Sequence, residues 1–144
     1  MGDGVMKHVY SVFGYIVATF ATQATSHFLL FKEHYDAVIW MKPDPVFAFG
    51  LLSMIIQGTI MSLVFSWLKP RAGLMIDSLA VSWLFGAFLV SYISFGEAAK
   101  YAVPSMASWI GVEIFAGAVQ FTMAGLLMGL AHGRSVAHRP SNEK

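Results

Sequence analysis

The chain contains no cysteine in its 144 residues. Disulfide exchange, thiolate catalysis, iron–sulfur clusters and cysteine-ligated zinc are therefore excluded. Charge is also scarce, because charged residues make up 12% of the chain against about 25% in an average soluble domain. The net charge of +1 is too small to indicate nucleic acid or an acidic macromolecule as a partner. Hydrophobic residues make up 57%, so the composition predicts one domain whose solvent is lipid.

Long apolar runs are present, whereas the alternating pattern of β-strands is not. A membrane-spanning helix needs about 20 largely apolar residues, and four segments qualify, at about 8–31, 45–68, 73–95 and 106–131. Helices and closed barrels are the structures that span lipid, and these runs are too continuous for a barrel. We therefore expect an all-α membrane protein, an antiparallel four-transmembrane-helix bundle over residues 1–131 with a polar cytoplasmic tail at 132–144.

Polar breaks separate the four runs. Asp44 and Pro45 suit the N-cap and first position of the second helix. The segment from Glu97 to Pro104 separates the third run from the fourth and is expected to be a loop.

The distribution of lysine and arginine predicts the orientation of the helices. One side of the membrane would carry six of these residues, namely Lys7, Lys69, Arg71, Arg134, Arg139 and Lys144. The other side would carry three, namely Lys32, Lys42 and Lys100. Because cytoplasmic loops are enriched in these residues, we expect both termini on the cytoplasmic side.

Several polar side chains fall within the apolar runs, where a central charge costs about 2.5–3.5 kcal/mol. His27, Gln23 and Gln57 lie in the first two helices, and Glu113 and Gln120 in the fourth. Gln23 and His27 share one helix face, since residues four apart stack. We expect these five residues to form a cluster in the outer half of the bundle, with His27 facing Glu113.

Two interpretations of this cluster stay open. In the first, its residues form a site that binds a polar small molecule or exchanges protons between His27 and Glu113. Alternatively, they only hydrogen-bond across helices, each bond contributing about 0.6–2 kcal/mol.

Other polar and small residues have structural interpretations. Asp77 lies near the start of the third helix, where it would meet the positive end of the helix dipole and pair with Lys69 or Arg71. Small residues form two stripes, one of Ser78, Ser82 and Gly86 and one of Gly125 and Gly129, and both are expected to pack within the bundle.

His27, His34 and Asp36 are the residues whose types and spacing come nearest to a set of metal ligands. On a continuous helix the two histidines would lie about 10 Å apart, too far to share an ion. We therefore expect neither a metal nor a cofactor. His132 and His138 follow the last apolar run and are expected to be solvated.

No phosphate-binding loop, nucleophile elbow or paired-carboxylate spacing is present. The sequence therefore favours a non-enzymatic binder of lipid or a small molecule, or an accessory subunit of a membrane complex. The alternative is a transporter or membrane-embedded enzyme built on His27 and Glu113. Membrane lipid is the expected partner, with a homo-oligomer or a larger complex as further options, and nucleic acid is not expected.

Short motifs along most of the chain carry a resemblance. They are Ser26-His27-Phe28-Leu29-Leu30 with Tyr35 and Trp40, then Tyr101, Pro104, Trp109, Gln120, Gly125 and Gly129. In these the chain resembles a group of small four-helix proteins of the bacterial inner membrane, known as a domain of unknown function. The resemblance implies the same topology and location, and no particular activity.

Overall fold

The computed structural model describes residues 2–38, 46–68 and 73–137. These residues form helices and no strand, so the prediction of an all-α fold is confirmed. The elements are α1 (Gly2–Thr25), the π-helix η1 (Ser26–Leu30), α2 (Lys32–Asp36), α3 (Phe47–Leu68), α4 (Leu74–Ser91), the π-helix η2 (Tyr92–Glu97) and α5 (Met106–Ala137).

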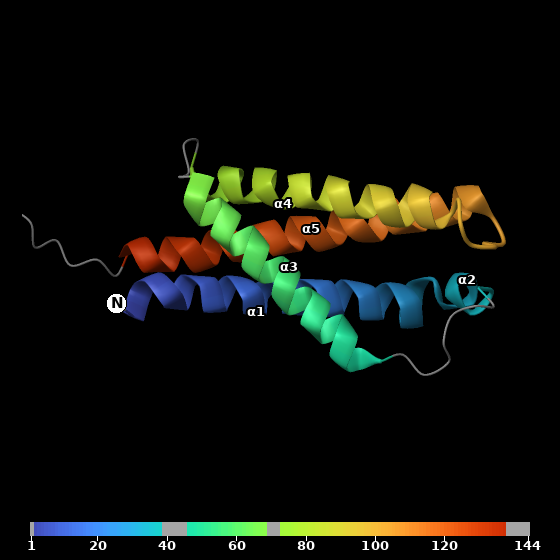
Figure 1. Ribbon diagram of the computed structural model, residues 1–144, viewed down its shortest axis with the longest axis horizontal. Coiled ribbons are helices and arrows are strands. Elements are labelled where there is room, and N and C mark those ends of the chain that lie inside the picture. The colour runs from blue at the N-terminus through green and yellow to red at the C-terminus, as the bar shows by residue number, and fades with distance from the viewer. Residues whose placement is uncertain (1, 39–45, 69–72, 138–144) are drawn as a thin grey trace, which may run out of the picture.

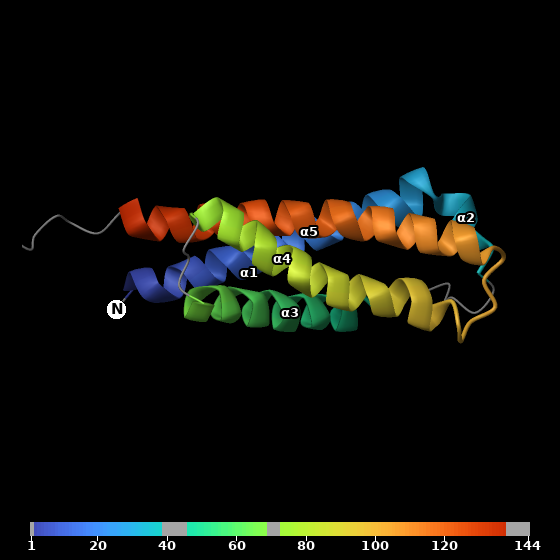
Figure 2. The same ribbon diagram turned by 90° about the horizontal axis from the view of Figure 1, so that it is seen from above.

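The long helices α1, α4 and α5 lie alongside one another, whereas α3 crosses α1 obliquely (Figure 1). Helix α5 packs along both α1 and α4, and α3 packs on α1. Helix α1 lies beside α5 in Figure 1 and passes behind it obliquely in Figure 2, and the two helices are in contact. The short helix α2, the π-helix η2 and the start of α5 meet at one end of the molecule, which we call the α2 end.

The outer surface is strongly apolar. Phe49, Trp67 and Phe88 expose 72%, 81% and 80% of their surface, respectively. Three helical segments, Phe47–Leu68, Leu74–Glu97 and Met106–Gly133, are long and apolar enough to cross a membrane. Because exposed apolar side chains of this size need a lipid solvent, the structure indicates a membrane protein.

Small residues fill the contact between α4 and α5. A Cβ atom added to Gly86 would lie 2.7 Å from the ring of Phe121, and one added to Gly125 would lie 3.0 Å from the Cα atom of Leu79. The Ser82 hydroxyl donates a hydrogen bond to the Phe121 carbonyl oxygen at 2.6 Å. The two predicted stripes of small residues therefore pack against each other within the chain.

Two helices extend beyond the apolar runs that predicted them. Helix α1 begins at Gly2 rather than near residue 8, and α5 continues to Ala137. The tail predicted from residue 132 therefore begins too early. The apolar run marks the part of a helix that faces lipid, whereas backbone hydrogen bonding can continue past it. The predictions for Trp40, Lys42, Asp44, Pro45, Lys69, Arg71 and residues 138–144 lie outside the described residues.

We predict that Gly86→Ala destabilises the protein by about 1–3 kcal/mol, because the new methyl group has no room beside the buried Phe121 ring. The matched control is Gly111→Ala on α5, where an added Cβ meets nothing within 4 Å. There the better helix propensity of alanine should stabilise the protein by up to about 1 kcal/mol. Thermal unfolding of both variants in one detergent measures the difference, and equal effects would contradict the tight α4–α5 contact.

Candidate functional site

A hydrogen-bonded network joins the three predicted glutamines through α1. The Gln23 side-chain amide donates to Gln120 Oε1 at 2.9 Å. Gln120 Nε2 in turn lies 3.1 Å from Thr19 Oγ1 and 3.5 Å from the Tyr15 hydroxyl. Tyr15 donates to Gln57 Oε1 at 2.5 Å. The network therefore links α1, α3 and α5, and every amide in it has a partner on another helix.

Glu113 and His27 are connected through Tyr35. The Tyr35 hydroxyl donates to Glu113 Oε1 at 2.7 Å. The His27 ring stacks on the Tyr35 ring with centroids 3.7 Å apart and an interplanar angle of 13°. The described residues show no direct hydrogen bond or ion pair between His27 and Glu113. Tyr35 therefore lies between the two residues that we expected to face each other.

Tyr35 reaches this position because α2 folds back against the start of α5. Its side chain is 4% exposed and packs with Val38, Trp109 and Val112. Burial, together with the neighbouring Glu113 carboxyl, raises the pKa of the Tyr35 phenol above its usual value. The phenol therefore stays protonated across the neutral pH range and remains a hydrogen-bond donor to Glu113.

Two π-helices shape the α2 end. Such wide turns are rare in helices and occur frequently at functional sites. η1 carries His27 to the face of Tyr35 and Ser26 to its hydroxyl, with 3.5 Å between the oxygens. η2 extends α4 by one wide turn and ends at Glu97. The segment that begins at Glu97, which the sequence predicted as a loop, therefore starts inside a helix.

A cavity of about 380 Å³ lies among α1, α3, α4, η2 and α5, and we call it the polar cavity. Its polar lining residues are Thr19, Gln23, Ser53, Gln57, Tyr92, Glu97, Glu113 and Gln120. Its apolar lining residues are Met54, Leu89, Val90, Ile93 and Phe121, with Gly50 and Gly117. Four of the five residues expected to cluster thus line one cavity, whereas His27 does not.

The acidic side chains that line the polar cavity are two carboxyl groups. Glu97 and Glu113 contribute two carboxyl groups, and no lysine, arginine or histidine is among its lining residues. Lys100 lies nearby, where its ammonium group donates to the Tyr92 hydroxyl at 3.1 Å and sits 4.9 Å from the ring centroid. Apart from this cation outside the lining, the cavity offers carboxyl, amide and hydroxyl groups from α1, α3, η2 and α5, interspersed with the apolar side chains of Met54, Leu89, Val90, Ile93 and Phe121.

The prediction for His132 is wrong, because its side chain is buried in the bundle with 5% of its surface exposed. Its ring nitrogens lie 3.2 Å from Ser11 Oγ and 3.1 Å from Ser66 Oγ. His8 lies beside it and contacts Ser62 Oγ at 2.8 Å. These serines on α1 and α3 satisfy the imidazoles, so α5 remains packed one turn beyond its apolar run. This cluster joins three helices far from the polar cavity.

The other predicted residues have structural partners. Asp77 accepts a hydrogen bond from the Gly73 backbone N–H at 3.1 Å, which caps α4 as the dipole argument predicts. Asp36 pairs with Lys32, and His34 lies 3.2 Å from Ser108 Oγ. In the described part of the chain, no group of three histidine, aspartate or glutamate residues is placed to hold a metal ion.

Comparison with known proteins gives no relative from which a function can be transferred. No family model, curated protein or solved structure matches the chain. The function is therefore inferred from the site itself.

Proposed function

We propose that the protein is an antiparallel bundle of four transmembrane helices in a bacterial inner membrane, with both termini in the cytoplasm. The helix whose span is least evident is α1, because polar residues occupy its inner face. Its outer face carries the exposed side chains of Phe13, Val17 and Phe20, as a lipid-facing helix requires. α1 also lies beside α5, which is long and apolar enough to span a membrane (Figure 1). The six-to-three bias of lysine and arginine supports the orientation.

We predict that single cysteines at Lys42 and Lys100 react with a membrane-impermeant maleimide from the outside of intact cells. Single cysteines at Lys69 and Ser141 should react only after the membrane is opened, because they lie on the cytoplasmic side in this topology. The natural chain has no cysteine, so no background residue needs removal. The reverse pattern would contradict the orientation, and external labelling at only one of Lys42 and Lys100 would contradict four spans.

We further propose that the protein binds a small amphipathic amine in the polar cavity. The observation that carries this proposal is the combination of two carboxyl groups, three glutamine side chains and an apolar wall around one space. A protonated amine offers both a positive charge and N–H donors to Glu97, Glu113 and the amide oxygens. Its hydrocarbon part would contact Met54, Leu89 and Phe121.

The size of the polar cavity limits the ligand. Sites for small molecules usually measure about 300–1,000 Å³, and this cavity of about 380 Å³ is at the lower end. It accommodates a head group with a short apolar chain rather than an entire phospholipid.

Binding fits the lining better than catalysis does. The lining contains no histidine, cysteine or lysine. The hydroxyl of Ser53 accepts a hydrogen bond from Gln57 at 2.9 Å, so no base activates it as a nucleophile. The carboxyl of Glu113 is held by Tyr35. These contacts orient polar groups toward the cavity without forming a nucleophile–base pair.

We predict that decylamine stabilises the purified protein against thermal unfolding at pH 7, whereas decanoate of the same chain length does not. A ligand that binds the native state stabilises it by RT ln(1 + [L]/Kd), so at one ligand concentration the tighter ligand gives the higher unfolding temperature. Glu97→Gln should weaken decylamine binding roughly tenfold, because it removes one charged hydrogen-bond acceptor.

Glu33→Gln is the matched control, since Glu33 is an exposed carboxyl on α2 and does not line the cavity. It should leave decylamine binding unchanged. Equal stabilisation by the amine and the carboxylate, or equal losses in the two glutamate variants, would contradict the proposal.

A further inference from the structure

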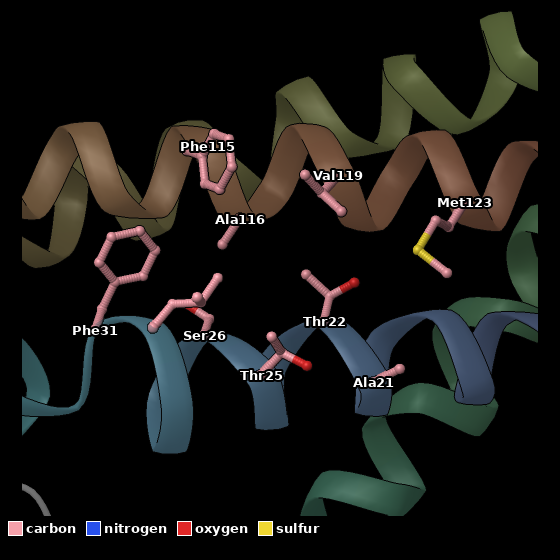
Figure 3. Close-up of a pocket in the computed structure, with 10 residues that line it drawn as sticks. Ala21, Thr22, Thr25, Ser26, Phe31, Phe115, Ala116, Val119 and Met123 are labelled. Carbon is pink, nitrogen blue, oxygen red and sulfur yellow. The ribbon is translucent and has the colours of Figure 1, made fainter.

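A second pocket, drawn in Figure 3, lies between α1 and α5. It is on the side of this helix contact opposite the polar cavity. It has a volume of about 330 Å³, and we call it the side pocket. Its lining residues are Ala21, Thr22, Thr25, Ser26, Leu30, Phe31, Phe115, Ala116, Val119 and Met123. None of these side chains is ionisable, so the side pocket suits an uncharged molecule.

The side pocket is continuous with the lipid-facing surface. Leu30 and Phe115 at one end expose 62% and 54% of their surface, and Met123 at the other end exposes 38%. A molecule dissolved in the hydrocarbon of the bilayer can therefore enter sideways. Water is a poor occupant of such an apolar space, since apolar cavities of this kind stay dry.

One polar atom in the side pocket has no partner. The Thr22 side chain is 9% exposed, and its hydroxyl oxygen is buried without a hydrogen bond from or to any described residue. In Figure 3 the Thr22 side chain rises from α1 into the space below Val119. A buried hydroxyl without a partner is unfavourable, and in lipid no water is at hand to satisfy it. A ligand with a hydrogen-bond acceptor would satisfy it.

The neighbouring hydroxyl of Ser26 does not offer a second donor. The Tyr35 hydroxyl already donates its hydrogen bond to Glu113. In the contact of 3.5 Å between Ser26 Oγ and the Tyr35 oxygen, the Ser26 hydroxyl is therefore the donor. At the end of the side pocket the rings of Phe31 and Phe115 meet edge to face, with centroids 6.2 Å apart. The side pocket thus combines one free donor with aromatic and aliphatic walls.

We propose that the side pocket binds a neutral, lipid-soluble molecule through a carbonyl group that accepts a hydrogen bond from Thr22, as the head group of a lipid-soluble quinone would. The volume holds one ring, and the open side lets an apolar tail remain in the bilayer. The site is separate from the polar cavity and does not depend on amine binding there.

The test uses two probes that differ in the acceptor. Decylubiquinone carries ring carbonyls, whereas decylbenzene has a ring and the same tail without them. Decylubiquinone should raise the unfolding temperature of the detergent-purified protein more than decylbenzene does. Thr22→Val keeps the shape of the side chain and removes the donor, so it should weaken decylubiquinone binding about tenfold and leave decylbenzene unchanged.

A structural role for the Thr22 hydroxyl would give a different result. Removing a hydroxyl that has no partner should leave the ligand-free protein as stable as before, or more stable. A loss of stability in ligand-free Thr22→Val, with the quinone preference unchanged, would therefore overturn the proposal.

A second pair of variants tests the location. Ala21→Phe fills the side pocket from an exposed position and should abolish stabilisation by decylubiquinone. Ala80→Phe makes the same change at an exposed position on α4, outside the side pocket. It should leave the stabilisation by decylubiquinone unchanged. Equal responses to the two probes in the natural protein, or equal effects of the two phenylalanine variants, would mean partition into detergent and would also overturn the proposal.

Discussion

In a lipid solvent, polar side chains find hydrogen-bond partners only within the protein, in one another or in backbone carbonyls, and this constraint organises the bundle. Helix α1 turns its hydroxyl and amide groups inward, where Tyr15 and Gln23 bond to Gln57 on α3 and Gln120 on α5. The phenylalanines of α1 then face outward. The position of α1 against two other helices follows from this pairing rather than from apolar burial, because lipid solvates apolar side chains as well as a protein interior does.

Helices α4 and α5 meet the same constraint in a different way. Gly86 and Gly125 let the two backbones approach closely enough for Ser82 to reach a carbonyl oxygen of the neighbouring helix. Outside this close contact, Leu84 and Phe88 on α4 and Phe115 and Leu130 on α5 lie exposed on the lipid face.

The two cavities flank the contact between α1 and α5 near the α2 end, where the wide turns η1 and η2 interrupt regular packing. In the polar cavity, paired amides and carboxyls still present polar atoms to the space. In the side pocket, the Thr22 hydroxyl lacks any described partner. The chemical difference between the cavities is thus a difference between carboxyl and amide acceptors and one neutral donor.

Helix positions and most of the polar cavity could be predicted from the sequence, because apolar runs and buried amides are visible as residue types. The bond from Tyr35 to Glu113 could not, since it depends on α2 folding back after a π-helix that no sequence pattern signals. Glu97 was missed for the same reason, at η2. His132 was misassigned because its partners, Ser11 and Ser66, are common residues on distant helices.

The claim that cross-helix polar pairs hold the α2 end together is tested most directly at the hydrogen bond between Tyr35 and Glu113. A double-mutant cycle with Tyr35→Phe and Glu113→Leu, scored by unfolding in mild detergent, measures their coupling. Phenylalanine keeps a ring beside His27 and removes only the hydroxyl. The pairing predicts a coupling energy of about 0.5–3 kcal/mol, with the double variant less destabilised than the sum of the single variants. Strictly additive losses would contradict the account.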